Sequence, residues 1–187
     1  MKVGKDAVDE LLEYNREFVK NERYKEFKTT KYPDRKIAIL TCMDTRLTNL
    51  LPAALGLKNG EVKMIKNAGG IISDPFGSSI KSLLVGIYEL GVEEIIVIGH
   101  TDCGAQHICE EVMEKEMLER GIPERTIELL KGELDFHGWL SGFDSVEGSV
   151  INTVKAIREH PLVPKDVDVS GFLIDSHTGE LTVLDRS

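Results

Sequence analysis

The feature that most restricts how this chain folds is an aliphatic run that ends abruptly in chemically active side chains. Residues 95–98 are Ile-Ile-Val-Ile, and the run stops at Gly99. A β-branched run of this length is typical of a strand covered on both faces of a sheet. His100 and Cys103 follow at once, and in open α/β sheets ligands bind beyond the carboxyl ends of the strands. The pattern predicts an α/β sheet with a functional site where this strand ends.

Strand and helix patterns alternate along the chain, which is the βαβ order of a parallel sheet. Short apolar runs predict strands at 37–42, 61–66, 94–99 and 169–174. Apolar residues at helical spacing predict helices at 47–55, 74–91 and 144–159. A turn at 176–179 then leads into 181–184, which predicts an antiparallel hairpin. We therefore expect a single α/β domain over 1–187, with a mostly parallel central β-sheet flanked by helices and an antiparallel C-terminal edge strand.

Capping residues suggest where two of these helices begin and end. Asn49 is a plausible N-cap for the helix at 47–55, with Pro52 in its first turn. Asp74 and Pro75 are typical of the start of the next helix, and Gly91 is typical of its end.

The N-terminal segment at about 6–24 has the spacing of an amphipathic helix. Its apolar stripe consists of Val8, Leu11, Leu12, Phe18 and Val19. Such a stripe needs a surface to bury it, and two surfaces explain it equally well. The helix packs either on its own domain or on a partner subunit.

Composition excludes several classes of function. The formal net charge is −9, and Lys and Arg are not clustered with aromatic residues, which argues against nucleic-acid binding. The N-terminus lacks an apolar signal core, and the aliphatic runs are too short to span a bilayer. We expect a cytoplasmic protein without a membrane partner. Three cysteines without a secretory signal favour thiol or metal chemistry over a disulfide framework.

A second group of chemically active side chains follows the strand at 37–42. Cys42, Asp44 and Arg46 stand at alternate positions. If the chain stays extended there, all three project to the same side, and Asp44 and Arg46 lie close enough to pair. A thiol, a carboxylate and a guanidinium in this pattern are hard to explain as part of a core.

Cys42, His100 and Cys103 each lie at or just beyond the carboxyl end of a predicted strand of one sheet, so they can converge. Two thiolates and one imidazole suit zinc, and three protein ligands with one open position are typical of a catalytic zinc site. We also expect Cys103 to begin a helix, whose N-terminus helps to hold its sulfur as thiolate.

Glycines follow the strand at 61–66. Ala68, Gly69 and Gly70 can expose backbone N–H groups that would bind an anionic substrate, although a plain turn explains the same residues. These three are the candidate substrate-binding residues.

The paired motifs resemble those of the β-class carbonic anhydrases. Cys42-x-Asp44-x-Arg46 and His100-x-x-Cys103-Gly104 occur in the order and at about the separation found in that family. The resemblance extends more loosely over most of the chain, and the compact length is similar to the smaller prokaryotic members. The region after Cys109 is not part of the resemblance.

The resemblance implies zinc-dependent, reversible hydration of carbon dioxide to bicarbonate and a proton by a zinc-bound hydroxide. Carbonic anhydrases are themselves the standard example of zinc lowering the pKa of coordinated water to about 7. By resemblance, Cys42, His100 and Cys103 bind one zinc ion per chain. Asp44 orients the water, and Arg46 keeps Asp44 ionised and turned from the metal.

The resemblance also implies a homodimer or dimer-based oligomer. Family members whose Asp closes onto the zinc under bicarbonate control have a tryptophan three residues before the first cysteine. This chain has Ile39 there, which favours the open arrangement.

Two other functions remain open. Cys109 would supply a fourth ligand if the zinc were structural and the protein a binding module, although six residues beyond Cys103 is a strained reach. A hydrolase for a related small substrate such as carbon disulfide would show the same ligands. A redox role is weaker, because the chain has no Cys-x-x-Cys.

Overall fold

The computed structural model describes residues 5–186, and the chain divides into two compact units between Lys31 and Tyr32. The first unit holds helix α1 (Lys5–Lys20) and the 3₁₀ helix η1 (Arg23–Phe27). The helix predicted at 6–24 is therefore confirmed over 6–20 and wrong over its last four residues, where Glu22 adopts a left-handed conformation with φ of 52° that interrupts the α-helical path.

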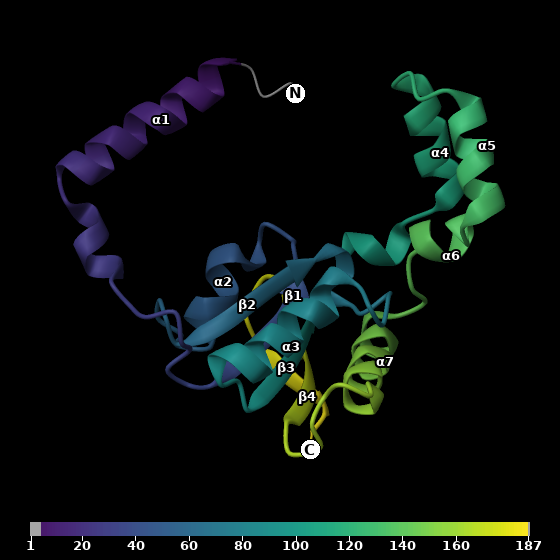
Figure 1. The fold of residues 1–187 in the computed structure, drawn as a ribbon. Helices are drawn as coiled ribbons and strands as arrows, with labels where there is room; N and C mark the ends of the chain where they lie inside the picture. The colour runs from purple at the N-terminus through teal and green to yellow at the C-terminus, as the bar shows by residue number, and fades with distance from the viewer. Residues whose placement is uncertain (1–4, 187) are drawn as a thin grey trace. The chain divides into compact units, whose positions relative to one another are not determined.

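The second unit is built around one five-stranded sheet in the order β2-β1-β3-β4-β5 (Figure 1). The strands are β1 (Ile37–Cys42), β2 (Val62–Asn67), β3 (Glu94–His100), β4 (Asp168–Ile174) and β5 (Leu181–Asp185). All neighbours pair in parallel except β4 and β5, which are antiparallel. The predicted sheet and its antiparallel edge strand are confirmed.

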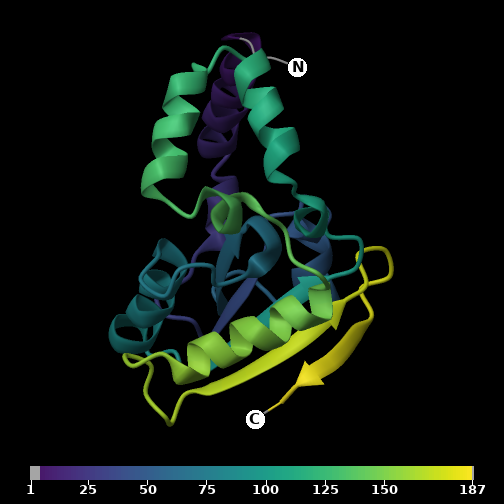
Figure 2. The same ribbon diagram turned by 90° about the vertical axis from the view of Figure 1, so that its right-hand side faces the viewer.

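Helices cover both faces of the sheet, and the strand side chains alternate between the two faces. On one face, Ala38 and Leu40 of β1 pack in a cluster with helices α3 (Ser78–Leu90) and α7 (Val146–Glu159). On the other face, Ile39 packs with helix α2 (Leu47–Ala54). Figure 2 shows α7 lying along β4. Because both faces are covered, the central strands are apolar at nearly every position.

Helix α2 begins before its predicted cap. Asn49 lies inside the helix, and Pro52 lies in its second half rather than its first turn. The turn at Asp44 starts the helix early, because the Asp44 carboxylate accepts a hydrogen bond from the Arg46 N–H and its carbonyl accepts one from the Leu47 N–H.

Helix α3 begins later than predicted, at Ser78. Asp74 caps a preceding turn instead, since its carboxylate accepts a hydrogen bond from the Phe76 N–H and its carbonyl one from the Gly77 N–H. The predicted end is confirmed, because Gly91 adopts the left-handed conformation with φ of 72°.

The charged segment between β3 and α7 forms the 3₁₀ helix η3 (Gly104–His107) and helices α4 (Glu110–Glu119), α5 (Glu124–Glu133) and α6 (Phe136–Leu140). Helices α4 and α5 project away from the sheet, with α6 at their base (Figure 2). Among residues 5–186, none of the helices combines the length and the apolar character needed to span a membrane.

One buried carboxylate ties these three helices together. Glu110 is the first residue of α4. Its Oε1 lies 3.0 Å from Lys131 Nζ of α5, and its Oε2 lies 2.8 Å from His137 Nδ1 of α6. Lys131 and then His137 hold the pKa of Glu110 below its usual value. A carboxyl with a lowered folded-state pKa stabilises the fold above its ordinary titration range and loses that effect as the pH falls through the lowered pKa.

We therefore expect Glu110→Gln to lower the melting temperature of this segment by a few degrees at pH 7. Trp139 of α6 is the only tryptophan of the chain, so its fluorescence reports the transition. The difference from wild type should shrink as the pH falls below the titration of Glu110. Glu111→Gln is the matched control, because the Glu111 carboxylate accepts a hydrogen bond from Cys109 and interacts with Lys131 and His137 only through longer-range electrostatics. An equal decrease of the melting temperature in both variants would contradict the stabilising role of Glu110.

Candidate metal centre

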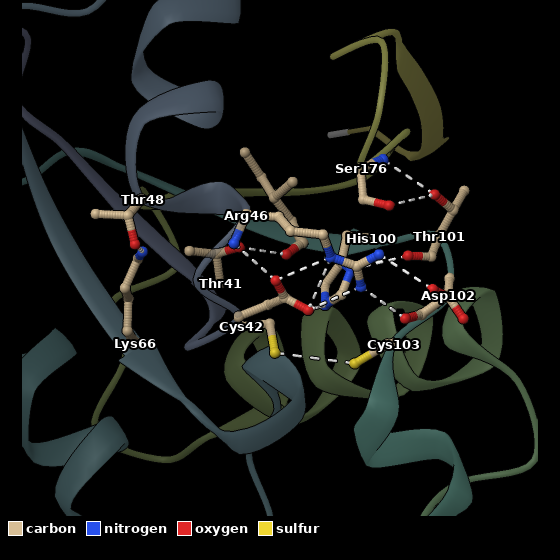
Figure 3. A network of polar contacts seen from close by, with 12 residues as sticks. Thr41, Cys42, Arg46, Thr48, Lys66, His100, Thr101, Asp102, Cys103 and Ser176 are labelled. Carbon is tan, nitrogen blue, oxygen red and sulfur yellow. Dashed lines mark hydrogen bonds and ion pairs between the residues drawn. The ribbon is translucent and has the colours of Figure 1, made fainter. Parts of the chain in front are cut away.

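Three buried side chains converge at the carboxyl ends of β1 and β3. Cys42 is the last residue of β1, His100 is the last residue of β3, and Cys103 lies in the turn that follows (Figure 3). The two sulfurs are 3.8 Å apart, and the three potential ligand atoms all lie within 4.8 Å of one another. The structure thus brings together all three predicted metal ligands, because adjacent parallel strands end at the same edge of the sheet.

The geometry of this cluster suits a tetrahedral metal ion. Two sulfurs that each lie about 2.3 Å from a tetrahedral zinc ion are about 3.8 Å apart. His100 Nδ1 lies 2.9 Å from the Thr101 carbonyl oxygen and donates to it, which leaves the lone pair on Nε2. His100 Nε2 is buried and has no hydrogen-bond partner within residues 5–186. A metal ion between the sulfurs would satisfy it.

The two thiols differ in acidity. Burial opposes ionisation of Cys42, but His100 and the backbone N–H groups of Asp44 and Gly69 lower the pKa of its thiol to about 7. Burial raises the pKa of Cys103 to about 11, and proximity to Cys42 adds to the rise. Cys103 precedes only a four-residue 3₁₀ helix. The Ala105 N–H of that helix lowers the pKa of Cys103 as predicted, but burial outweighs it, so the free thiol is not held as thiolate. Metal binding would have to release this proton.

Asp44 and Arg46 form the predicted pair beside this cluster. Arg46 Nη2 donates to Asp44 Oδ2 at 2.8 Å, and Arg46 Nε donates to Oδ1 at 3.1 Å. The hydrogen bonds from Arg46 hold the pKa of Asp44 at about 2. The extended backbone predicted here is wrong, since Arg46 is helical with φ of −59° and ψ of −33°. A turn makes the pair, and it leaves Asp44 Oδ2 3.8 Å from His100 Nε2.

Arg46 has a second acidic partner that the sequence did not reveal. Its Nη1 donates to Asp102 Oδ2 at 3.0 Å, and its Nη2 donates to the Asp102 carbonyl oxygen at 2.9 Å (Figure 3). Asp102 lies between two of the predicted ligands in sequence, and this position was the only available signal of its contact with the site.

A cavity of about 460 Å³ opens onto the pair and the cluster. Its lining includes Cys42, Asp44 and Arg46, together with the small or apolar residues Ala68, Gly69, Gly104, Ala105 and Ile108. The site therefore combines an acidic group and a guanidinium with an apolar wall.

Gly70 has a different position from the other two candidate substrate-binding residues. It ends the 3₁₀ turn η2 (Ala68–Gly70) and is not among the residues lining this cavity. Its φ is +66°, and a Cβ there would lie 2.8 Å from the Cys42 backbone nitrogen. Gly70 thus allows the turn to lie directly against the strand end that carries Cys42.

Cys109 lies outside the cluster. Its side chain is exposed, and its Sγ donates to Glu111 Oε2 at 2.8 Å. The group that brings three potential ligand atoms together consists of Cys42, His100 and Cys103 alone, among the residues described.

Fold and site together define a class of protein: a mostly parallel α/β sheet that carries, at the carboxyl ends of its strands, a Cys-His-Cys cluster able to hold a metal ion. Residues 37–181 match the family model described as carbonic anhydrase. The chain belongs to the carbonic anhydrase family, in its β class, and the resemblance inferred from the paired motifs is confirmed.

Known proteins similar to this chain agree with that assignment. "Putative carbonic anhydrase YtiB" of Bacillus subtilis is 47% identical over 178 residues, which cover 95% of each chain. The crystal structure of β-carbonic anhydrase isoform I from Trichomonas vaginalis is 39% identical, with a TM-score of 0.87 over 96% of this chain and 97% of that one. A carbon disulfide hydrolase from Acidianus is 31% identical over 79% of this chain and 76% of its own length.

Proposed function

We propose that this protein catalyses the reversible hydration of carbon dioxide to bicarbonate and a proton, with one zinc ion per chain. The observation that carries the proposal is the buried cluster of Cys42, His100 and Cys103 directly beside the Asp44–Arg46 pair, in which His100 Nε2 has no hydrogen-bond partner among residues 5–186. The proposal includes action in the cytoplasm as a homodimer or a dimer-based oligomer.

Cys42, His100 and Cys103 would hold the zinc, and the fourth position would stay open. A zinc ion in such a site lowers the pKa of a coordinated water molecule toward neutrality and so supplies a nucleophile at physiological pH. The hydrogen bond from His100 Nδ1 to the Thr101 carbonyl fixes the ring and its tautomer, so that Nε2 faces the cluster.

Asp44 would orient the attacking water. An ionised carboxylate only accepts hydrogen bonds, and the pKa of about 2 keeps Asp44 ionised at any physiological pH. Arg46 holds both carboxylate oxygens, which opposes rotation of Asp44 toward the metal. Asp44 can therefore accept a hydrogen bond from a water molecule in the cavity and so direct a lone pair of that water at the substrate.

The cavity suits a small substrate without charge. Ala68, Ala105 and Ile108 line it with apolar atoms, which favour carbon dioxide over water. The Gly69 N–H group donates a hydrogen bond to the Cys42 sulfur. Ala68 and Gly69 line the cavity and are proposed to contact the substrate, whereas Gly70 acts through its packing on Cys42.

The experiment that tests this function measures zinc by elemental analysis and carbon dioxide hydration by stopped flow at pH about 8.5 on the same preparation. We expect about one zinc per chain and hydration that an excess of chelator removes. Carbon disulfide is the second candidate substrate, because the carbon disulfide hydrolases are about as similar to the chain as "Beta-carbonic anhydrase 1" of Mycobacterium tuberculosis, at 31% and 34% identity. Release of hydrogen sulfide from carbon disulfide, without hydration of carbon dioxide, would overturn the proposal in favour of that candidate.

Asp44→Asn should retain the zinc and lose hydration activity by about 10- to 100-fold, the cost of removing a group that orients a metal-site ligand. The amide keeps the shape of the side chain but presents a donor where the water needs an acceptor. Asp34→Asn, an exposed change of the same charge, is the control and should keep full activity. Full activity in Asp44→Asn would contradict the orienting role.

A further inference from the structure

All three nitrogens of the Arg46 guanidinium are engaged. Nε and Nη2 face Asp44, whereas Nη1 and Nη2 face Asp102. Asp102 uses two different groups, its carboxylate at 3.0 Å and its main-chain carbonyl at 2.9 Å. Arg46 is therefore clamped between two acidic residues (Figure 3).

The two acidic residues that hold the Arg46 guanidinium follow different strands. Asp44 follows β1, and Asp102 follows β3 between His100 and Cys103. Asp102 adopts φ of 55°, a left-handed conformation that few residues other than glycine take. Strain of this kind persists where the surroundings enforce it, and it gathers at functional sites.

We propose that Asp102 is a positioning residue, which holds the Arg46 guanidinium in place and thereby keeps Asp44 turned away from the metal position. The inference rests on the proposed function for its consequence, but the clamp itself is a property of the chain. Asp44 Oδ2 already lies 3.8 Å from His100 Nε2, so a modest rotation would bring the carboxylate to the position where a metal would bind. The hydrogen bonds from Arg46 to Asp44 oppose that rotation, and the hydrogen bonds from Arg46 to Asp102 hold the guanidinium in place.

The solvent exposure of the Asp102–Arg46 ion pair limits how strongly Asp102 can hold Arg46. The Asp102 side chain is 73% exposed and that of Arg46 is 35% exposed, and exposed ion pairs are individually weak. Loss of the carboxylate also leaves the carbonyl contact in place. We therefore expect the side chain of Asp102 to change the population of released Arg46 by about two- to fivefold, not to switch the site on or off.

Two variants of Asp102 separate the contribution of its carboxylate from the contribution of its backbone. Asp102→Gly removes the carboxylate and accepts the positive φ without strain. Asp102→Asn tolerates the same φ and keeps an oxygen that can accept from Nη1, but it loses the charge. Asp34→Asn controls for loss of one exposed negative charge elsewhere.

The direct test is NMR of zinc-loaded protein labelled with ¹⁵N-arginine, in which Arg46→Lys identifies the Arg46 signals. We expect rotation about the Nε–Cζ bond of Arg46 to be about two- to fivefold faster in Asp102→Gly than in wild type. It should be nearly unchanged in Asp102→Asn and in the control. A rate in Asp102→Gly equal to that of wild type would overturn the clamp, whatever reaction the enzyme catalyses.

The consequence at the metal is tested with the cobalt-substituted protein and thiocyanate, whose binding is followed by absorption. If Asp44 reaches the metal more often, thiocyanate should bind about two- to fivefold more weakly to Asp102→Gly than to Asp102→Asn. Removal of a negative charge alone would strengthen binding equally in both variants, and that result would overturn the positioning role. Failure of the proposed reaction would instead show as absent carbon dioxide hydration in wild type, with both of these differences preserved.

Discussion

Cys103→Ser should lose the metal, with a zinc content below about a tenth of that of wild type and an affinity lower by more than about 100-fold. Partners that merely orient a ligand already contribute about 10- to 100-fold to affinity, and a serine hydroxyl does not supply the thiolate that zinc prefers. The remaining ligands, Cys42 and His100, would hold the ion by one sulfur and one nitrogen. Elemental analysis after dialysis and competition with a chromophoric chelator measure the loss, and hydration activity should disappear with the metal.

Cys109→Ser is the matched control, because it removes a thiol from an exposed position outside the cluster. We expect it to keep both zinc and activity. If Cys109→Ser also lost the metal, and wild type held zinc without hydrating carbon dioxide, the site would be a closed structural one and the proposed reaction would be wrong.

Gly70→Ala should destabilise the fold by about 2–5 kcal/mol. The left-handed conformation alone costs alanine about 1–2 kcal/mol, and overpacking adds roughly 1–3 kcal/mol. The overlap is with backbone, since the added Cβ would lie 2.8 Å from both the Cys42 nitrogen and the Thr41 carbonyl carbon, and backbone at the sheet centre cannot move aside cheaply. Thermal unfolding of the zinc-free protein should show a midpoint about 5–15 °C lower.

Gly56→Ala separates the two contributions. Gly56 has nearly the same φ, +62°, but a Cβ there would meet no atom within 4 Å. It should show only the conformational cost of about 1–2 kcal/mol. Equal destabilisation by the two substitutions would contradict the close packing of Gly70 on the end of β1. We also expect Gly70→Ala, but not Gly56→Ala, to weaken zinc binding, because Cys42 would shift.

The sheet and the cluster of Cys42, His100 and Cys103 were predictable because they depend on patterns that are visible in the sequence. Runs such as residues 95–98 show a strand covered on both faces, and the chemistry follows immediately at His100. Parallel strands then bring their carboxyl ends together by topology alone. For the same reason, Cys42 could be placed near His100 without any knowledge of side-chain geometry.

Helix starts and electrostatics were less predictable, because they depend on competing local contacts. Asp44 and Asp74 both cap turns through their side chains, so α2 begins before the cap predicted at Asn49, and α3 begins later than the cap predicted at Asp74 implies. The acidity of Cys103 is set by burial, which outweighs the hydrogen bond from the Ala105 N–H. The contact of Asp102 with Arg46 depends on an unusual φ, and no residue pattern marks it.

The pairing of β1 with β3 has a consequence for how the protein matures. Thr41 is in register with Ile98, so the ends that carry Cys42 and His100 come together only when these two central strands have zipped along their length. In the unfolded chain, His100 and Cys103 lie near His107 and Cys109 in sequence, whereas Cys42 is far from all four. The three-ligand site would therefore form only once the sheet is assembled, and a zinc ion bound there would stabilise the assembled state by mass action. Zinc supply should accordingly govern the lifetime of the assembled protein.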